Sequence, residues 1–498
     1  MKQVKEIMVK SALLLFFFGG ITSAVFAQSV HPKYTLKGDS IISPISLQYS
    51  DPSFIRRILL GTNYRKTWET PVSFPVFHMN ELGFKVKELG GGMQTKSLRL
   101  EDKKGEEWVL RSLEKDVSKA VPSIVQNTIG QSIAQDMISG SHPYAPLTVF
   151  ELAKAVGVVS AQPTYYYVPD DPAFGEFRAV FANTVCMLEE REPTWDNTET
   201  VNTEKLLEEL LEGKNHVLFQ EGLLKARLLD MLIGDWDRHA DQWRWGKKDS
   251  NNVTYYYAIP RDRDQAYFES TGLLVRTAKF FILPFLSEFK PRASSFKALN
   301  TKAWSFDALL LNSLSKKDWI RITQTFQQNL TDEVIHKAVA TMPSAIYALD
   351  GQKIESVLKI RRDELLKGSM KYYDFQARYV SIVGSKDEEL FDITGDKDSL
   401  TITVYNLEDK YKNLVLYKRT FLPEETSKIK LMSLDGKDKF VMSENAAARI
   451  KLTIDGGKGE NSFDLKGKVK YKIYESENSA KIFEDVLKTY LRIGIRFI

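Results

Sequence analysis

The spacing of hydrophobic residues changes twice along this chain of 498 residues, and that change constrains the fold most. Residues 83–116 alternate between apolar and polar side chains around glycine-containing turns, which predicts three strands. Residues 203–234 and 300–367 carry apolar side chains at helical spacing. From about residue 371 the alternation returns. The pattern predicts an α+β chain with a sheet-containing first part, a helical middle and an all-β end.

We therefore expect five regions. The first two are a signal peptide at 1–27 and an N-terminal extension at 28–75. The other three are a sheet-containing lobe at 76–195, a mostly helical lobe at 196–370 and a small all-β, sandwich-like domain at 371–498. Helices are expected over 121–140 and 147–157, and the segment FRAVFANTVCMLEE is expected to be a strand. The segment DGGKGEN (455–461) is expected to be a plain hairpin turn.

The N-terminus has the pattern of a secretory signal peptide. A basic segment, MKQVKEIMVK, precedes the apolar run SALLLFFFGGITSAVF, and Val25 and Ala27 fit a signal-peptidase site. Cleavage there would leave a mature chain that begins at Gln28, and no later apolar run is long enough for a transmembrane segment. We therefore expect an exported protein, periplasmic or at the cell surface or extracellular; an uncleaved N-terminal anchor is the alternative.

The net charge limits which binding partners we expect, and the cysteine content limits which disulfides can form. The formal net charge of the whole chain is +4, and residues 1–27 contribute three lysines and one glutamate to it. A nearly neutral mature chain gives no electrostatic reason to expect nucleic acid or an anionic membrane as a partner of the protein as a whole. Cys186 is the only cysteine, so no intramolecular disulfide forms, and we expect it to be a small buried side chain.

Two acid-rich clusters flank one predicted strand. GDWDRHADQW (234–243) follows an apolar helix, and PRDRDQ (260–265) follows the strand NVTYYYAIP. Asp237 could orient or deprotonate an acceptor hydroxyl, and Gln242 offers an oxygen ligand five residues later. Asp262 and Asp264 could hold Mg²⁺, which prefers oxygen ligands. Arg261 and Arg263 could pair with these carboxylates or with phosphate oxygens.

A glycine turn lies upstream, in GGGMQTK (90–96). Gly91 and Gly92 would let backbone N–H groups approach phosphates closely, and Lys96 follows them. Arg111, in WVLRSL, lies on a later strand where its charge could contact the same phosphates.

The order of these motifs resembles that of the HipA-like and CotH-like atypical kinases. The resemblance rests on GG-x-Q-x-K, the helix with LAKAVG, the strand ending in MLEE, GD-x-DRHA-x-Q and P-x-D-x-D, and it covers about 85–290, with helices to about 370. It implies a bilobal, protein-kinase-like core that uses Mg or Mn with ATP or another nucleotide. The chain is also similar to exported proteins of Bacteroidetes type that carry a C-terminal β module.

The resemblance implies a role for each motif. Asp237 would be the catalytic base. The metal ligands would be Gln242, Asp262 and Asp264. The nucleotide would contact Gly91, Gly92, Lys96 and Arg111, with an adenine hinge from Met187 to Glu189. Asp136 or Glu151 would supply the acid that pairs with the phosphate-binding side chain.

Three functions remain open at this stage. The first is metal-dependent phosphoryl transfer from a nucleotide to an unknown acceptor. The second is a catalytically inactive, kinase-like cell-envelope binding or scaffold protein whose β domain binds a protein or envelope partner; Arg111, Gln242 and an ATP-poor compartment favour it. The third is a hydrolase with Asp237 and Asp262 as acid and base. A purely structural role is also open, in which Asp237 pairs with Arg238 or Arg261 and His239 braces the loop.

Overall fold

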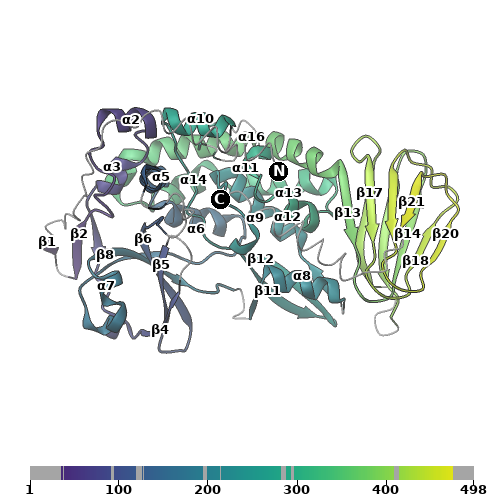
Figure 1. Cartoon of the computed structure of the whole chain (residues 1–498), viewed down its shortest axis with the longest axis horizontal. Coiled ribbons are helices and arrows are strands. Elements are labelled where there is room, and N and C mark those ends of the chain that lie inside the picture. The colour runs from purple at the N-terminus through teal and green to yellow at the C-terminus, as the bar shows by residue number, and fades with distance from the viewer. Residues whose placement is uncertain are drawn as a thin grey trace. The chain divides into compact units, whose positions relative to one another are not determined.

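The computed structural model confirms the α+β fold class, because sheets and helices follow each other in the order that the hydrophobic patterns predict (Figure 1). The structure describes residues 35–37, 39–90, 95–118, 126, 128–194, 199–213, 215–281, 286, 288–292, 296–408 and 414–474. The expected signal peptide at 1–27 and the glycine pair Gly91 and Gly92 lie outside the described residues. Within those ranges, no helix combines the length and the apolar character that crossing a bilayer requires.

The first described segment, expected to be an extension, contains defined elements. Its three strands form an antiparallel sheet in the order β1-β2-β3. The elements are β1 (Thr35–Lys37), β2 (Ser40–Ser43), α2 (Phe54–Leu60), α3 (Arg65–Glu69), β3 (Val72–Pro75) and α4 (Met79–Leu82).

A five-stranded antiparallel sheet in the order β4-β5-β6-β8-β7 forms the next lobe. Its strands are β4 (Lys85–Gly90), β5 (Thr95–Glu101), β6 (Glu107–Lys115), β7 (Thr164–Val168) and β8 (Thr184–Glu190). One face of this sheet is apolar and contains Leu98, Leu110 and Cys186, all fully buried. Burial raises the pKa of the Cys186 thiol to about 12, which fits the expected role as a small buried side chain.

Two helix and strand expectations in this lobe need correction. Of the helix expected over 121–140, the described part contains α5 (Ile129–Met137) and the 3-10 turn η1 (Ile138–Gly140), and the helix after it is α6 (Ala145–Ala155). The segment FRAVFANTVCMLEE is not one strand, because it begins with η2 (Pro172–Phe177) and α7 (Arg178–Phe181). Asn183, at a φ of 59°, then turns the chain into β8.

The middle of the chain packs around α9 (Gln220–Ile233), whose last eight residues are all buried. The other helical elements are α8 (Thr203–Glu212), η3 (Ala240–Gln242), α10 (Leu273–Phe281), α11 (Phe296–Leu299), α12 (Trp304–Leu310), α13 (Lys316–Asn329), α14 (Asp332–Val339), α15 (Ser344–Ile346), η4 (Tyr347–Gly351) and α16 (Gln352–Ala377). A small sheet in the order β10-β12-β11-β9 lies against them, with β9 (Thr200–Asn202), β10 (His216–Leu218), β11 (Trp243–Ser250) and β12 (Val253–Pro260).

The last described segment is the all-β domain, built from two sheets whose inner faces share one apolar core. The boundary expected at 371 falls inside α16, and the first strand of the domain begins at Tyr379. The strands are β13 (Tyr379–Val383), β14 (Glu389–Gly395), β15 (Leu400–Asn406), β16 (Val415–Phe421), β17 (Lys428–Met432), β18 (Lys439–Met442), β19 (Lys451–Asp455), β20 (Ser462–Leu465) and β21 (Tyr471–Tyr474).

Most of these strands pair in parallel, because the chain winds between the two sheets. One sheet is wholly parallel in the order β13-β17-β19-β21, and β14, β18 and β20 are parallel in the other. This register stacks Phe391 on Phe440 and Phe440 on Phe463, with ring centroids 4.6 and 5.3 Å apart. The segment DGGKGEN therefore joins β19 to β20 in the opposite sheet, and the expectation of a hairpin turn is wrong.

The first corner of this winding is attached to the helical lobe. The backbone N–H of Lys386 donates to the carbonyl of Leu211 at the end of α8. Asn312, just after α12, donates to the carbonyl of Ser381 at 2.7 Å and accepts from Arg419 at 2.6 Å. These polar contacts fix the β domain to the lobe that carries the acid clusters.

Glu389, in the first strand after that corner, has an unusual environment for a carboxyl group. It is 1% exposed, and burial raises its pKa to about 8 despite hydrogen bonds from Ser385. Asp438 accepts from the Glu389 backbone, and burial raises the pKa of Asp438 to about 7. A carboxyl that stays protonated in the folded state and ionises in the unfolded state makes stability depend on pH.

The free energy of unfolding is therefore expected to fall as the pH rises from about 4.3, the ordinary pKa of glutamate, to about 8. Glu389 contributes a slope of up to about 1.4 kcal/mol per pH unit, because the unfolded chain has lost a proton that the folded chain keeps. Glu389→Gln should flatten this slope and raise the stability at pH 8, measured by urea unfolding at pH 5 and pH 8. A slope that the variant leaves unchanged would contradict this assignment; Glu444→Gln, in an exposed turn, is the control.

Candidate functional site

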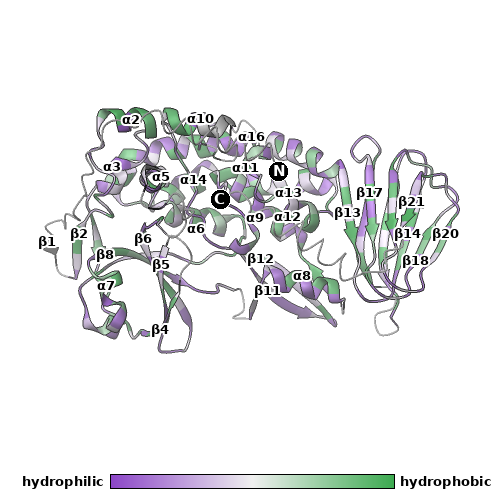
Figure 2. Ribbon diagram, viewed as in Figure 1, coloured by the Kyte–Doolittle hydropathy of each residue, from purple (hydrophilic) through white to green (hydrophobic). Residues whose placement is uncertain are grey.

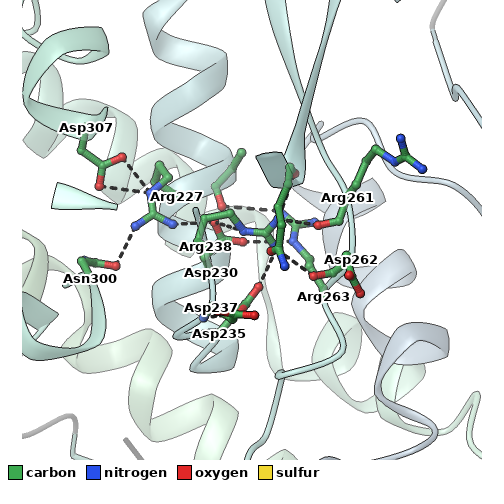
Figure 3. Close-up of polar contacts among 12 residues, drawn as sticks. Arg227, Asp230, Asp235, Asp237, Arg238, Arg261, Asp262, Arg263, Asn300 and Asp307 are labelled. Carbon is green, nitrogen blue, oxygen red and sulfur yellow. Dashed lines mark hydrogen bonds and ion pairs between the residues drawn. The ribbon is translucent and has the colours of Figure 1, made fainter. Parts of the chain in front are cut away.

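Asp230, on the last turn of α9, is the centre of a buried ionic network (Figure 3). It is fully buried and forms ion pairs with three guanidinium groups. The distances are 2.7 Å to Arg227, 3.3 Å to Arg238 and 3.0 Å to Arg263. Burial alone would raise the pKa of Asp230, but the three arginines outweigh it and hold the pKa below its ordinary value.

The network extends from α9 to α12 and balances its own charge. Arg227 also pairs with Asp307 at 2.9 Å and donates to Asn300 at 2.7 Å, and Arg238 pairs with Asp235 at 2.5 Å. Three buried carboxylates, of Asp230, Asp235 and Asp307, thus face the three buried arginines. Such a balanced set avoids the large cost of an unpaired buried charge.

Arg238 joins the two acid clusters that the sequence singles out. Its guanidinium donates to the backbone carbonyls of Gln242 and Arg261, and to that of Asp262 at 3.5 Å. Gly234, at a φ of 77°, ends α9 and lets the chain turn so that Arg238 points back to Asp230. The side chain of Arg238 therefore holds the loop after α9 and the loop after β12 together.

The two predicted key carboxylates lie in these loops. Asp262 is exposed and has a φ of 52°, a conformation that non-glycine residues rarely adopt. Surrounding protein would raise its pKa, but the charges of Lys115, Arg111 and other cations lower it below the ordinary value. Asp237 is half-buried and forms an ion pair with Lys302. A purely structural role would have Asp237 pair with Arg238 or Arg261. This expectation is wrong, because Arg238 pairs with Asp235 and Asp230 instead.

Lys115, at the end of β6, is a site residue that the sequence analysis missed. Its side chain is 11% exposed and forms an ion pair with Asp264. Burial lowers the pKa of Lys115, while the nearby carboxylates of Asp262 and Asp237 raise it. The sequence offered one signal, since Lys115 lies four residues after Arg111, but no local pattern shows that its side chain reaches the acids.

Arg111 and the predicted hinge come together on the sheet. Arg111 pairs with Glu189 on the neighbouring strand β8, and the side-chain atoms Nε and Oε1 are 2.7 Å apart. The acid that pairs with Arg111 is thus Glu189, and the expectation of Asp136 or Glu151 is wrong for this arginine. Asp136 pairs with Arg56 and Arg65.

A cavity of about 70 Å³ lies between the sheet and the loop after β12. It is lined by Arg111, Met187, Glu189, Arg261, Asp262 and Asp264, among others. Ligand pockets for drug-sized molecules usually have about 300–1,000 Å³. A nucleotide would therefore need the residues around this cavity, among them the pair Arg111–Glu189, to move apart.

Lys96 is not brought to this site. It is exposed on β5, and its neighbours Leu98 and Leu100 at alternate positions belong to the apolar face of the sheet. Its charge lies close enough to lower the pKa of the Cys186 thiol, on that same face. Arg111 lies on the opposite face, because adjacent residues of a strand point to opposite sides.

Gln242 is the residue that fits a metal best. It is buried, and its side-chain oxygen Oε1 has no hydrogen-bond partner in the part of the chain that the structure describes. An unpaired buried acceptor is costly unless a ligand satisfies it. No group of three His, Cys, Asp or Glu side chains in the described ranges could hold a metal by itself. Mg²⁺ commonly uses one or two protein oxygens together with phosphates and water, so a site of this kind needs no larger group of acids.

Comparisons with known proteins concern the fold. No protein-family model matches the chain, and no curated protein is similar to it in sequence. The Helicobacter pylori proinflammatory kinase CtkA is 11% identical with a TM-score of 0.28, and the match covers 55% of this chain and 90% of CtkA. HipA of Shewanella oneidensis MR-1, from a toxin–antitoxin complex with HipB and operator DNA, is 12% identical with a TM-score of 0.31, over 58% and 67%.

The Golgi casein kinase with Mn and ADP bound is 8% identical with a TM-score of 0.32, over 59% of this chain and 75% of that one. These solved structures are kinases or kinase-like proteins, and the similarity to them is one of fold. At such low TM-scores the likeness carries no functional argument, which therefore depends on the residues of this chain.

Replacing Arg238 tests whether it joins the two loops. Arg238→Met should lower the free energy of unfolding by about 3–5 kcal/mol, because it leaves buried carboxylates without their partner. The measurement is urea unfolding at neutral pH. The control is Arg99→Met, which removes the exposed pair with Glu88 and should cost less than about 1 kcal/mol. Equal costs for the two variants would contradict the role given to Arg238.

Proposed function

We propose that this chain is an exported, atypical-kinase-like protein that transfers a phosphoryl group from a nucleotide to an acceptor with Mg²⁺ or Mn²⁺. The observation that carries the proposal is that Arg238 binds both acid-rich loops, while Lys115 lies close enough to Asp262 and Asp237 for both carboxylates to raise its pKa. The unpartnered side-chain oxygen of Gln242 supports it. Export rests on the signal-peptide pattern of residues 1–27.

Each residue has a role in this proposal. Asp237 accepts the proton of the acceptor hydroxyl. The hydroxyl oxygen then bonds to the phosphorus, and the bond between the phosphorus and the leaving nucleotide oxygen breaks. Asp262 and Gln242 hold the metal, with Asp264 beside them. The metal supplies neutralisation of the phosphate charge. Lys115 and Arg111 stabilise the same charge once they leave Asp264 and Glu189.

Metal-dependent nucleotide binding is the first expected result. The melting temperature of a chain of residues 28–498 should rise with ATP and Mg²⁺ or Mn²⁺, because a ligand that binds the folded state stabilises it. Asp262→Asn should abolish the rise. Asp237→Asn should keep it but lower self-phosphorylation, measured by mass spectrometry, about a hundredfold or more. Asp241→Asn is the matched control, since Asp241 is exposed in the same loop.

Lys115 and Lys96 give a second expected result, because the structure and the sequence pattern favour different lysines. Lys115→Met should weaken metal–nucleotide binding about tenfold, the effect of losing one charge-assisted contact to phosphate. Lys96→Met should leave the dissociation constant unchanged, because Lys96 projects from the other face of the sheet. Isothermal titration calorimetry measures both. If Lys96→Met weakens binding and Lys115→Met does not, the phosphates would instead bind at the glycine turn beside Lys96.

A second function is favoured by the ion pairs that close the cleft. Arg111–Glu189 and Lys115–Asp264 leave a cavity of about 70 Å³, far smaller than a nucleotide needs. In this alternative the chain is a catalytically inactive, kinase-like scaffold of the cell envelope, and its β domain binds a protein or envelope partner. The absence of any thermal shift with every nucleotide and both metals would select it.

A hydrolase with two carboxylates fits less well. Such an enzyme keeps one of its acids protonated by raising its pKa. The surrounding lysine and arginines lower the pKa of Asp262, so Asp262 would not be the protonated acid of such a pair.

A further inference from the structure

Helices α2 and α10 expose large apolar side chains on neighbouring surfaces. We define the α2–α10 patch as Phe54, Ile55, Ile58, Leu59 and Leu273, all of them exposed. Phe54 is 73% exposed and Leu273 is 59% exposed. The four residues of α2 lie on one face of the helix, since they are one, three, four or five positions apart. Figure 2 shows α2 as mostly hydrophobic, and α2 contacts α10.

The patch is held rigidly, so its exposure is a property of the fold. Ser53 caps α2 by accepting from the backbone of Arg56, and the Arg56 side chain is bound to Asp136 at 2.9 Å. At the other end, Thr62 donates from its backbone to Thr271 at 3.1 Å. A Cβ atom on Gly272 would lie 2.4 Å from the backbone oxygen of Leu59, so the two segments touch there.

Three exposed cationic side chains, of Arg57, Arg276 and Lys290, lie on or next to the elements of the patch, and one exposed acid, Asp51, precedes α2. Arg57 is exposed on α2 and forms no ion pair with any described residue, and Arg276 is exposed on α10. Arg276 and Lys290 share one carboxylate, that of Glu288, whose side chain is 8% exposed. The accessible charge beside the apolar side chains is therefore mostly cationic, although the whole chain is close to neutral.

We propose that the α2–α10 patch binds the surface of a lipid bilayer that contains anionic lipids. Exposed aliphatic side chains and phenylalanine next to arginine and lysine are typical of a helix that lies in the membrane interface. The apolar side chains enter the headgroup boundary, and the cations contact lipid phosphates.

The proposal uses residues that lie outside the acid clusters, so it stands independently of phosphoryl transfer. A short helix of seven residues provides few inserted side chains, so the binding is reversible. It would place the cleft near a membrane surface without any membrane-spanning helix in the described part of the chain.

The test is sedimentation with vesicles of phosphatidylcholine alone or mixed with phosphatidylglycerol. Thr35–Ile498 is one compact unit, so a chain that starts at residue 28 keeps the whole unit and omits the apolar run 11–26. It should bind the mixed vesicles, more weakly as salt increases, because salt screens the attraction. The double variant Phe54→Ser/Ile58→Ser should lower the partition coefficient about tenfold or more, since both lost side chains are apolar.

Two further variants separate the causes. Arg57→Gln/Arg276→Gln should weaken binding to the mixed vesicles and leave phosphatidylcholine binding unchanged. Tyr471→Ser/Tyr474→Ser, on the exposed strand β21, is the control and should bind as the parent chain does. Unchanged melting temperatures show that the variants remain folded. The proposal is overturned if the parent chain binds neither vesicle, if Phe54→Ser/Ile58→Ser binds normally, or if that variant converts a dimer to a monomer.

Discussion

The candidate site depends on one carboxylate, that of Asp230, which three arginines share in the interior of the helical lobe. Each arginine comes from a different segment: Arg227 from α9, Arg238 from the loop after it and Arg263 from the loop after β12. A buried carboxylate cannot stay charged without such partners, and the arginines cannot be buried without carboxylates. The network therefore fixes the relative positions of α9, the loop that follows it and the loop after β12.

Two half-buried carboxylates next to this network are each paired with a lysine. Lys302 pairs with Asp237 and Lys115 with Asp264, so the acids face cations even before any ligand binds. These ion pairs explain why acids concentrated in two short loops are compatible with a stable fold, because each charge has a counter-charge nearby.

The β domain shows the limit of hydrophobic patterns. Alternation in segments such as LTITVYNL and SKIKLMSL correctly predicts strands and two apolar inner faces. It does not report which strands pair, because the period of two is the same in parallel and antiparallel sheets. The stacked rings of Phe391, Phe440 and Phe463 arise from parallel register, and DGGKGEN crosses between sheets for the same reason. Similarly, alternation did not separate α7 from β8, where an asparagine turn ends a short helix.

By itself the sequence determined the fold class, most strands and helices, and the two loops that carry acids, because periodicity and turn chemistry are local properties. It also placed Arg111 and Glu189 on two strands of one sheet. Only the tertiary structure decided which charges meet. In the sequence, Asp230 and Lys302 lie in segments with helical spacing and Lys115 lies at the end of an expected strand, whereas Lys96 matches a phosphate ligand but lies on the opposite face of the sheet. Ion pairs form across space, between segments that the fold brings together, and no local pattern encodes that distance.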